Sequence, residues 1–317
     1  MRPVLAARRW WSPARRDRTF RGTTALFAGL LLLLAAAIAW SLAHGSHAAV
    51  VKFGWRFLTS REWDPVADDY GALPFIWGTL ATSLLALAIA APLGLGAAVF
   101  LAELAPPWLS APVSLAIELL AAIPSIVYGL WGVFVLLPRL RPVQAWLIEH
   151  ASGVPLFSGA PIGTGLLAGA LVLAIMILPI LTSLSRDVLN AVPKSLREAA
   201  YAVGATHWET LRGPVLDYGR AGLVAAALLA LGRALGETMA VTMVIGNTPT
   251  ISVSLFQPAY TMSSVLANEF SEATGKVHTA ALFEIAFLLF GLTIAVNACA
   301  RALLWKLGAG GGAAVRD

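Results

Sequence analysis

The sequence predicts an all-α integral membrane protein with six transmembrane helices, and three observations support this fold class. Of 317 residues, 58% are hydrophobic and only 12% are charged, whereas a soluble domain has about 25% charged residues. The mean hydropathy is +0.78. The apolar residues are also gathered into long continuous runs, which are typical of membrane spans. The composition therefore argues against an ordinary soluble domain.

Six apolar runs are each near or above the roughly 20 residues that a helix needs to cross a bilayer. The first follows an arginine-rich start, as in a signal peptide, but it is long and no small-residue cleavage site follows it cleanly. We therefore expect a retained span. The six predicted spans are residues 24–43, 73–102, 112–137, 163–184, 219–246 and 279–305.

The positions of the basic residues predict that both termini are cytoplasmic. The net charge is +5, and the lysines and arginines flank the apolar runs, which favours membrane orientation over nucleic-acid binding. With the N-terminus inside, the cytoplasmic side carries 15 basic residues and the outer side six. The segment 44–72 is then outside. The expected cytoplasmic segments are the tail 1–23, the loops 103–111 and 185–218, and the tail 306–317.

The longest cytoplasmic loop, 185–218, predicts two short helices joined by a glycine turn. Each helix has a Ser or Thr followed three residues later by Glu, which is the spacing of a capping box. A glycine between them permits the left-handed conformation that ends a helix. These residues are Ser195 with Glu198, Gly204, and Thr206 with Glu209. Pro214 is expected to stop or kink the second helix.

The run EAAYAVG in this loop resembles the EAA loop of ABC-importer permeases, which have the type I, MetI-like fold. In that family the loop forms a coupling helix that enters a groove on a separate ATPase subunit. This sequence departs from the family pattern further on: Pro214 stands at a usually apolar position, and Asp217 follows Leu216 where proline is usual. The residues that match are Glu198, Ala199, Ala200 and Gly204.

Three further stretches resemble one branch of these permeases, the phosphate permeases called PstC. They are residues 57–83, 117–132 and 232–247. The resemblance implies a type I permease domain over 73–305, preceded by the first span and the outer segment. It implies a subunit of the bacterial inner membrane that imports inorganic phosphate. The implied partners are a PstA-like second permease, a PstB-like ATPase dimer, a PstS-like soluble binding protein and membrane lipid.

We expect the chain itself to be non-catalytic, with no cofactor, metal ion or nucleic acid. It has no GxxxxGK[ST] loop for the phosphates of ATP. An intramembrane enzyme would need a nucleophile with a base, or a metal pair, at span depth, yet no histidine lies inside a predicted span. A secondary transporter would have no use for an EAA loop. The alternatives that stay open are a permease for another oxyanion, such as sulfate or molybdate, and, less favoured, a secondary transporter or a membrane enzyme.

Arg233 and Glu237 are the main candidates for the substrate pathway. On a single helix they would face the same side, one turn apart. A charge at the bilayer centre costs about 2.5–3.5 kcal/mol on insertion scales, and such residues usually face a bundle interior or a cavity. The planar guanidinium of an arginine can hold two oxygens of an oxyanion at once. We therefore predict that Arg233 contacts the transported anion.

Glu237 favours phosphate over sulfate or molybdate. Phosphate keeps a proton near neutral pH and can donate it to an ionised carboxylate, which only accepts hydrogen bonds. A fully deprotonated anion would be repelled instead. The alternative is that Glu237 only neutralises Arg233, and the sequence leaves both roles open.

Three more polar residues lie in or near the predicted third span. Glu118 either lines an inner cavity or has an interfacial or capping role. Ser125 and Tyr128 follow the expected kink at Pro124 and either offer hydroxyls to a passing anion or form hydrogen bonds between helices. Glu118, Ser125 and Tyr128 complete the predicted pathway residues.

Overall fold

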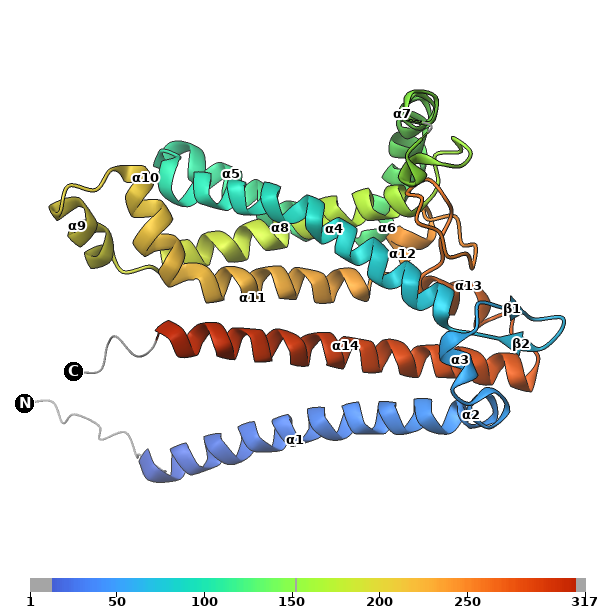
Figure 1. The fold of residues 1–317 in the computed structure, drawn as a ribbon. Helices are drawn as coiled ribbons and strands as arrows, with labels where there is room; N and C mark the ends of the chain where they lie inside the picture. The colour runs from blue at the N-terminus through green and yellow to red at the C-terminus, as the bar shows by residue number, and fades with distance from the viewer. Residues whose placement is uncertain (1–12, 152, 312–317) are drawn as a thin grey trace, which may run out of the picture.

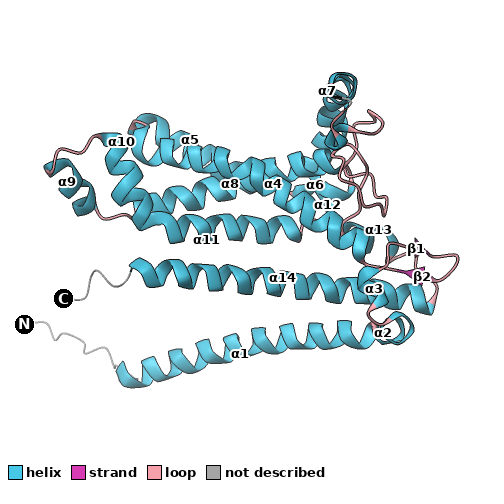
Figure 2. Cartoon of the chain, in the orientation of Figure 1, coloured by secondary structure: helices cyan, strands magenta, loops and turns pink. Residues whose placement is uncertain are grey.

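The computed structural model describes residues 13–151 and 153–311, and it is mostly helical (Figure 1, Figure 2). Six helices are long and apolar enough to cross a membrane, beginning at residues 17, 73, 125, 166, 207 and 276. The predicted all-α fold with six spans is confirmed. Arg2, Arg8 and Arg9, which carry part of the orientation argument, lie outside the described residues. The longest helices are α1 (Pro13–Gly45), α4 (Leu73–Val99), α8 (Leu166–Asn190), α11 (Leu216–Leu235) and α14 (Lys276–Gly311).

Shorter elements cap the two ends of this bundle (Figure 1). At one end, together with the described ends of α1 and α14, lie α9 (Lys194–Ala202) and α10 (His207–Thr210). The opposite end carries α2 (His47–Phe53), α3 (Arg56–Thr59), the hairpin of β1 (Trp63–Asp64) and β2 (Asp69–Tyr70), α7 (Leu137–His150), a 3-10 turn (Pro155–Phe157) and α13 (Met262–Glu269).

The predicted third span, 112–137, is wrong as a single helix. The helix α5 (Pro107–Ala121) ends, and after a short non-helical segment a second helix, α6 (Ser125–Trp131), begins. Pro124 adopts an extended ψ of 138°, because its missing N–H and its ring cannot continue the preceding helix. A π turn (Gly132–Leu136) leads into α7, which turns away from the direction of the bundle (Figure 1).

The predicted fifth span, 219–246, is also wrong as a single helix. The helix α11 begins earlier and ends at Leu235, and after Gly236 the chain forms only the short α12 (Met239–Thr242). Glycine is a poor helix former and costs about 1 kcal/mol relative to alanine inside a helix. Arg233 and Glu237 therefore do not lie on one helix, contrary to the expectation of a shared helical face.

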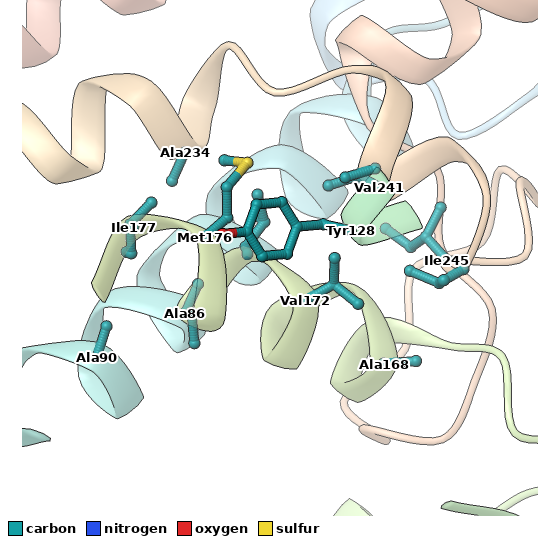
Figure 3. Packing of buried hydrophobic residues seen from close by; sticks show 14 of the residues in the cluster. Ala86, Ala90, Tyr128, Ala168, Val172, Met176, Ile177, Ala234, Val241 and Ile245 are labelled. Atoms are coloured by element: carbon teal, nitrogen blue, oxygen red, sulfur yellow. The ribbon is translucent and has the colours of Figure 1, made fainter. Parts of the chain in front are cut away.

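Close packing of α4 against α8 forms the centre of the bundle. In a membrane the hydrophobic effect does not drive helices together, because lipid tails are as apolar as the helix surfaces. Small residues instead let helices approach closely and gain packing contacts. Alanines of α4, such as Ala86 and Ala90, face Val172 and Ile177 of α8 within the largest buried cluster (Figure 3). The cluster also takes in Tyr128 of α6 and residues of α11 and α12, so the ends of both broken spans belong to the central core.

A second cluster joins the hairpin to the ends of α4 and α14. Trp63 packs edge-on against Tyr70 and Phe75, with ring centroids 4.8 and 4.7 Å apart. Its indole N–H donates to Glu269 at 2.9 Å, and the same carboxylate lies 3.1 Å from His278. Burial, aided by the charge of nearby Asp68, raises the pKa of Tyr70 to about 12. The hairpin is therefore fixed to the bundle by aromatic stacking and a shared carboxylate.

Gly78 of α4 offers a test of this packing. A Cβ added at Gly78 would collide with the backbone oxygen of Tyr260, whereas one added at Gly96 of the same helix meets nothing within 4 Å. We expect Gly78→Ala to lower the free energy of unfolding by about 1–3 kcal/mol, because the obstacle is backbone. Gly96→Ala, the control, should be neutral or slightly stabilising. Thermal unfolding of the purified protein in detergent measures both, and equal stability of the two variants would contradict the close approach.

Candidate functional site

The EAA loop forms a helix, a glycine turn and a second helix, as predicted. Gly204 follows α9 with a φ of +85°, in the left-handed region that favours glycine. Thr206 then caps α10: its hydroxyl accepts from the amide of Glu209 at 3.3 Å, and Glu209 accepts from the amide of Thr206 at 2.8 Å. The second predicted capping box is confirmed.

The first predicted capping box is wrong. The helix α9 starts at Lys194 behind Pro193, and no side chain caps it. Proline has no N–H and a fixed φ, so it starts a helix without needing the Ser195–Glu198 pair. Of the two effects expected of Pro214, it does not stop the second helix, but it lies in a π turn, Leu211–Val215, that interrupts the regular α-helix between α10 and α11.

The EAA residues lie on the exposed side of this loop. Glu198 and Ala199 are exposed and Ala200 is half-buried, while α9 contains no buried residue. Tyr201, Val203 and Trp208 add exposed apolar surface, with Val203 86% exposed. Exposed apolar side chains near an exposed carboxylate are suited to docking another protein.

Arg233 lies in the last turn of α11 and is exposed in the isolated chain. The described residues form no ion pair between Arg233 and Glu237. The predicted alternative, in which Glu237 only neutralises Arg233 within the bundle, stays a prediction. The side chain of Arg233 is accessible from outside the chain.

Glu237 is buried, with 8% of its surface exposed, directly after the end of α11. Its carboxylate accepts a hydrogen bond from the amide of Ala240 at 3.2 Å and so caps α12. Its backbone oxygen accepts from the hydroxyl of Ser263 at 2.7 Å. Backbone groups freed by the break therefore find partners inside the protein, as the bilayer interior requires.

Tyr128 bridges the break in the other interrupted span. It is buried, and its hydroxyl donates to the backbone oxygen of Leu120 near the end of α5, at 2.8 Å. In this conformation the hydroxyl joins two helices, which is the second of its two predicted roles. Ser125 starts α6 and is half-buried.

Helices α6 and α12 approach each other closely beside these residues. A Cβ added at Gly129 would lie 3.1 Å from the Cα of Ala240 and 2.6 Å from the sulfur of Met243. The two interrupted spans thus meet where Tyr128, Arg233 and Glu237 are located. Three of the predicted pathway residues belong to one region of the fold.

Glu118 lies apart from this group, on α5. Its side chain is 54% exposed and pairs with Arg186 of α8 at 3.5 Å, and Arg186 also lies 3.3 Å from Asp187. The pair connects α5 with the end of α8. Glu118 therefore lies where α5 and α8 meet, and the described residues give it no contact with Arg233.

Sequence reasoning missed several residues of these sites. Ser263 lies 26 residues after Glu237 and Glu103 lies 94 residues before its partner Arg197, so no local spacing connects either pair. The sequence feature that could have indicated the Glu103–Arg197 pair is the carboxylate of Glu103 at the end of an apolar run, where a charged side chain needs a partner. Among the described side chains, no group of three or more His, Cys, Asp or Glu residues is placed to hold a metal ion.

Six apolar spans, helix breaks after α5 and α11 with an arginine at the second of them, and an exposed helical hairpin at one end are typical of a membrane permease that docks another protein. Residues 90–304 match the family model described as binding-protein-dependent transport system inner membrane component. The chain belongs to this family. It is a permease subunit of an ABC importer and a multi-pass protein of the inner membrane.

Relatives that match nearly the whole chain indicate which branch of the family this chain resembles. Phosphate transport system permease protein PstC of Mesorhizobium japonicum is 50% identical over 95% of this chain and 93% of its own length. The protein of the same name from Haemophilus influenzae is 47% identical, over 96% and 98%. The protein from Pasteurella multocida is 48% identical over 91% of each chain. The predicted resemblance to PstC permeases is confirmed.

Solved structures agree on the fold. Two inward-facing crystal forms of the MetNI methionine ABC transporter each have a chain that matches this one with TM-scores of 0.53 and 0.55. They are 20% and 19% identical and cover 73% and 74% of this chain and 94% of their own. The predicted MetI-like fold is confirmed.

The cap formed by Glu237 can be tested through stability. Glu237→Ala removes the acceptor for the Ala240 amide, and we expect it to lower the free energy of unfolding by about 1 kcal/mol. Glu237→Gln keeps a carbonyl oxygen at the same place and should stay within about 0.5 kcal/mol of the original. Thermal unfolding in detergent measures both. A Gln variant as unstable as the Ala variant would show that the oxygen is not the feature that matters.

Proposed function

We propose that this chain is the permease subunit of an ABC importer that carries inorganic phosphate across the inner membrane. The relatives that match over nearly the whole chain are named phosphate transport permeases. The observation that carries the proposal within the molecule is the exposed guanidinium of Arg233 at the junction of the interrupted spans. An arginine without a carboxylate partner is available to bind an oxyanion through two parallel hydrogen bonds.

Together with Arg233, Glu237 would be the group that distinguishes phosphate from sulfate and other fully deprotonated oxyanions. One carboxylate oxygen accepts from the Ala240 amide, and an ionised carboxylate has further acceptor capacity. A protonated phosphate oxygen can donate to it, whereas sulfate has no proton to donate near neutral pH. Burial makes this discrimination stronger, because an unpaired oxyanion beside a buried carboxylate is repelled in a medium of low dielectric constant.

The pathway would include Ser125 and Tyr128 at the second break and Glu118 further along α5. In this conformation Tyr128 is held by Leu120 and Glu118 by Arg186. Transport by alternating access requires that such contacts exchange between states. These side chains would therefore alternate between holding the helices together and facing the anion.

The remaining components of the importer would be separate chains. A PstB-like ATPase dimer would supply ATP hydrolysis and receive the loop through Glu198, Ala199, Ala200 and Gly204, while this subunit itself would be non-catalytic. A PstA-like permease would pair with this chain, whose α5 and α6 expose apolar residues such as Leu119 and Ile126. A PstS-like binding protein would deliver phosphate to the opposite end. The described ends of α1 and α14 lie at the same end as α9 and α10 (Figure 1), and this end would face the cytoplasm, in keeping with the expectation that both termini are cytoplasmic.

Substitution of Arg233 tests this proposal. In vesicles that contain the complete importer and ATP, we expect Arg233→Gln to lower the initial rate of labelled phosphate uptake by at least about tenfold, because a charge-assisted hydrogen bond is lost. Glu237→Gln, which retains the cap of α12, should lower uptake and let sulfate compete.

Arg301→Gln is the matched control, since Arg301 is an exposed arginine of α14. It should leave uptake unchanged. Near-normal uptake by both the Arg233 and the Glu237 variants would rule out a pathway role for the pair.

A further inference from the structure

Arg197 is the neighbour of Glu198 in α9, but its side chain binds the transmembrane bundle instead of facing outward. Its guanidinium donates to the carboxylate of Glu103 at 2.6 Å. It also donates to the backbone oxygens of Leu189 at 2.9 Å and Val192 at 2.6 Å. One side chain thus connects α9 with two separate spans.

Glu103 lies on a π turn (Phe100–Leu104) that ends the second span directly after α4. The side chains of Glu103 and Arg197 are 9% and 19% exposed. A short, hydrogen-bonded and nearly buried pair of this kind is difficult to break, because either charge left alone would be desolvated without a partner. The pair is therefore a firm connection between α9 and the end of α4.

The two backbone acceptors lie at the end of α8, which finishes at Asn190. The last carbonyls of a helix have no partner within it and carry partial negative charge. The guanidinium of Arg197 satisfies the carbonyl of Leu189 and that of Val192 just beyond the helix end. The end of α8 thereby holds the arginine in a fixed orientation toward Glu103.

The remaining contacts of α9 with the bundle are weaker. Leu196 is half-buried against the cluster that includes Leu189 and Val215. In the part of the chain that the structure describes, no other side chain of α9 forms an ion pair. A displacement of α9 must therefore either carry the end of α4 along or separate a nearly buried charge pair.

The helix α4 leads from this pair to the candidate pathway. Near its far end, Gly78 lies against the backbone of Tyr260, and the hydroxyl of Thr79 accepts from the amide of Met262 at 2.9 Å. The next residue, Ser263, donates to the backbone oxygen of Glu237. A continuous series of packed backbone and hydrogen bonds thus connects Glu103 with the break that holds Glu237.

We propose that the Arg197–Glu103 pair transmits the displacement of α9 to the second span, and so couples the ATPase to the pathway. This inference rests on the proposed function, in which α9 docks on an ATPase. The two neighbouring residues of α9 have different roles: Glu198 contacts the ATPase, and Arg197 positions the second span. Arg197 is a positioning residue and does not touch the transported anion.

The test uses the complete importer in vesicles, with both phosphate uptake and ATP hydrolysis measured. We expect Arg197→Gln and Glu103→Gln each to lower the number of phosphate ions taken up per ATP hydrolysed by about tenfold. Co-purification of the ATPase should be retained. Arg220→Gln, which changes an exposed arginine at the same end of the molecule, should leave the ratio unchanged.

The double variant, Arg197→Gln with Glu103→Gln, separates coupling from simple stability. It leaves no unpaired buried charge, so thermal stability should recover relative to the single variants. The ratio should stay low, no worse than in the singles, because both residues act through one pair. If the double variant regained the original ratio of phosphate taken up to ATP hydrolysed, the pair would contribute to stability alone and not to coupling.

The other outcomes are equally decisive. Single variants with a normal ratio, or loss of ATPase co-purification in all three variants, would overturn the proposed link. An unsubstituted complex that takes up no phosphate would instead contradict the proposed function, so the two failures are distinguishable.

Discussion

The absence of water in the bilayer is the constraint on which the rest of this structure depends. A helix that stops inside a membrane frees backbone groups that must find partners within the protein. Two spans stop in this way. Tyr128 reaches back to Leu120 across one break, and Glu237 with Ser263 satisfies the other. The polar side chains of the candidate pathway are therefore also the groups that make the interrupted helices possible.

The ends of the two interrupted spans lie side by side. The absence of a side chain at Gly129 lets α6 approach Ala240 of α12, and both pack on α8 in the central cluster (Figure 3). One oxygen of Glu237 accepts from the backbone, and among the described residues no carboxylate forms an ion pair with Arg233. Its charge is then free to be matched by an anion.

Much of the fold follows from the order of residues alone. The uninterrupted spans are long apolar runs, and the capping box at Thr206 is a local pattern that the structure reproduces. The breaks were harder to predict, because the apolar run continues through Gly236 while the helix does not. The cap that Glu237 forms on α12, and the bond from Ser263 to its backbone oxygen, depend on where α11 ends, which no periodicity reveals. The pair of Arg197 with Glu103 likewise depends on how α9 folds back.

Selection of the anion is the central claim, since Arg233 attracts any oxyanion and Glu237 is argued to accept a proton from one kind. Competition against labelled phosphate in vesicles that contain the complete importer and ATP measures this most directly. The account predicts that unlabelled phosphate abolishes uptake of the label, while equal concentrations of sulfate or molybdate leave it unchanged. Inhibition by sulfate as strong as that by phosphate would contradict it.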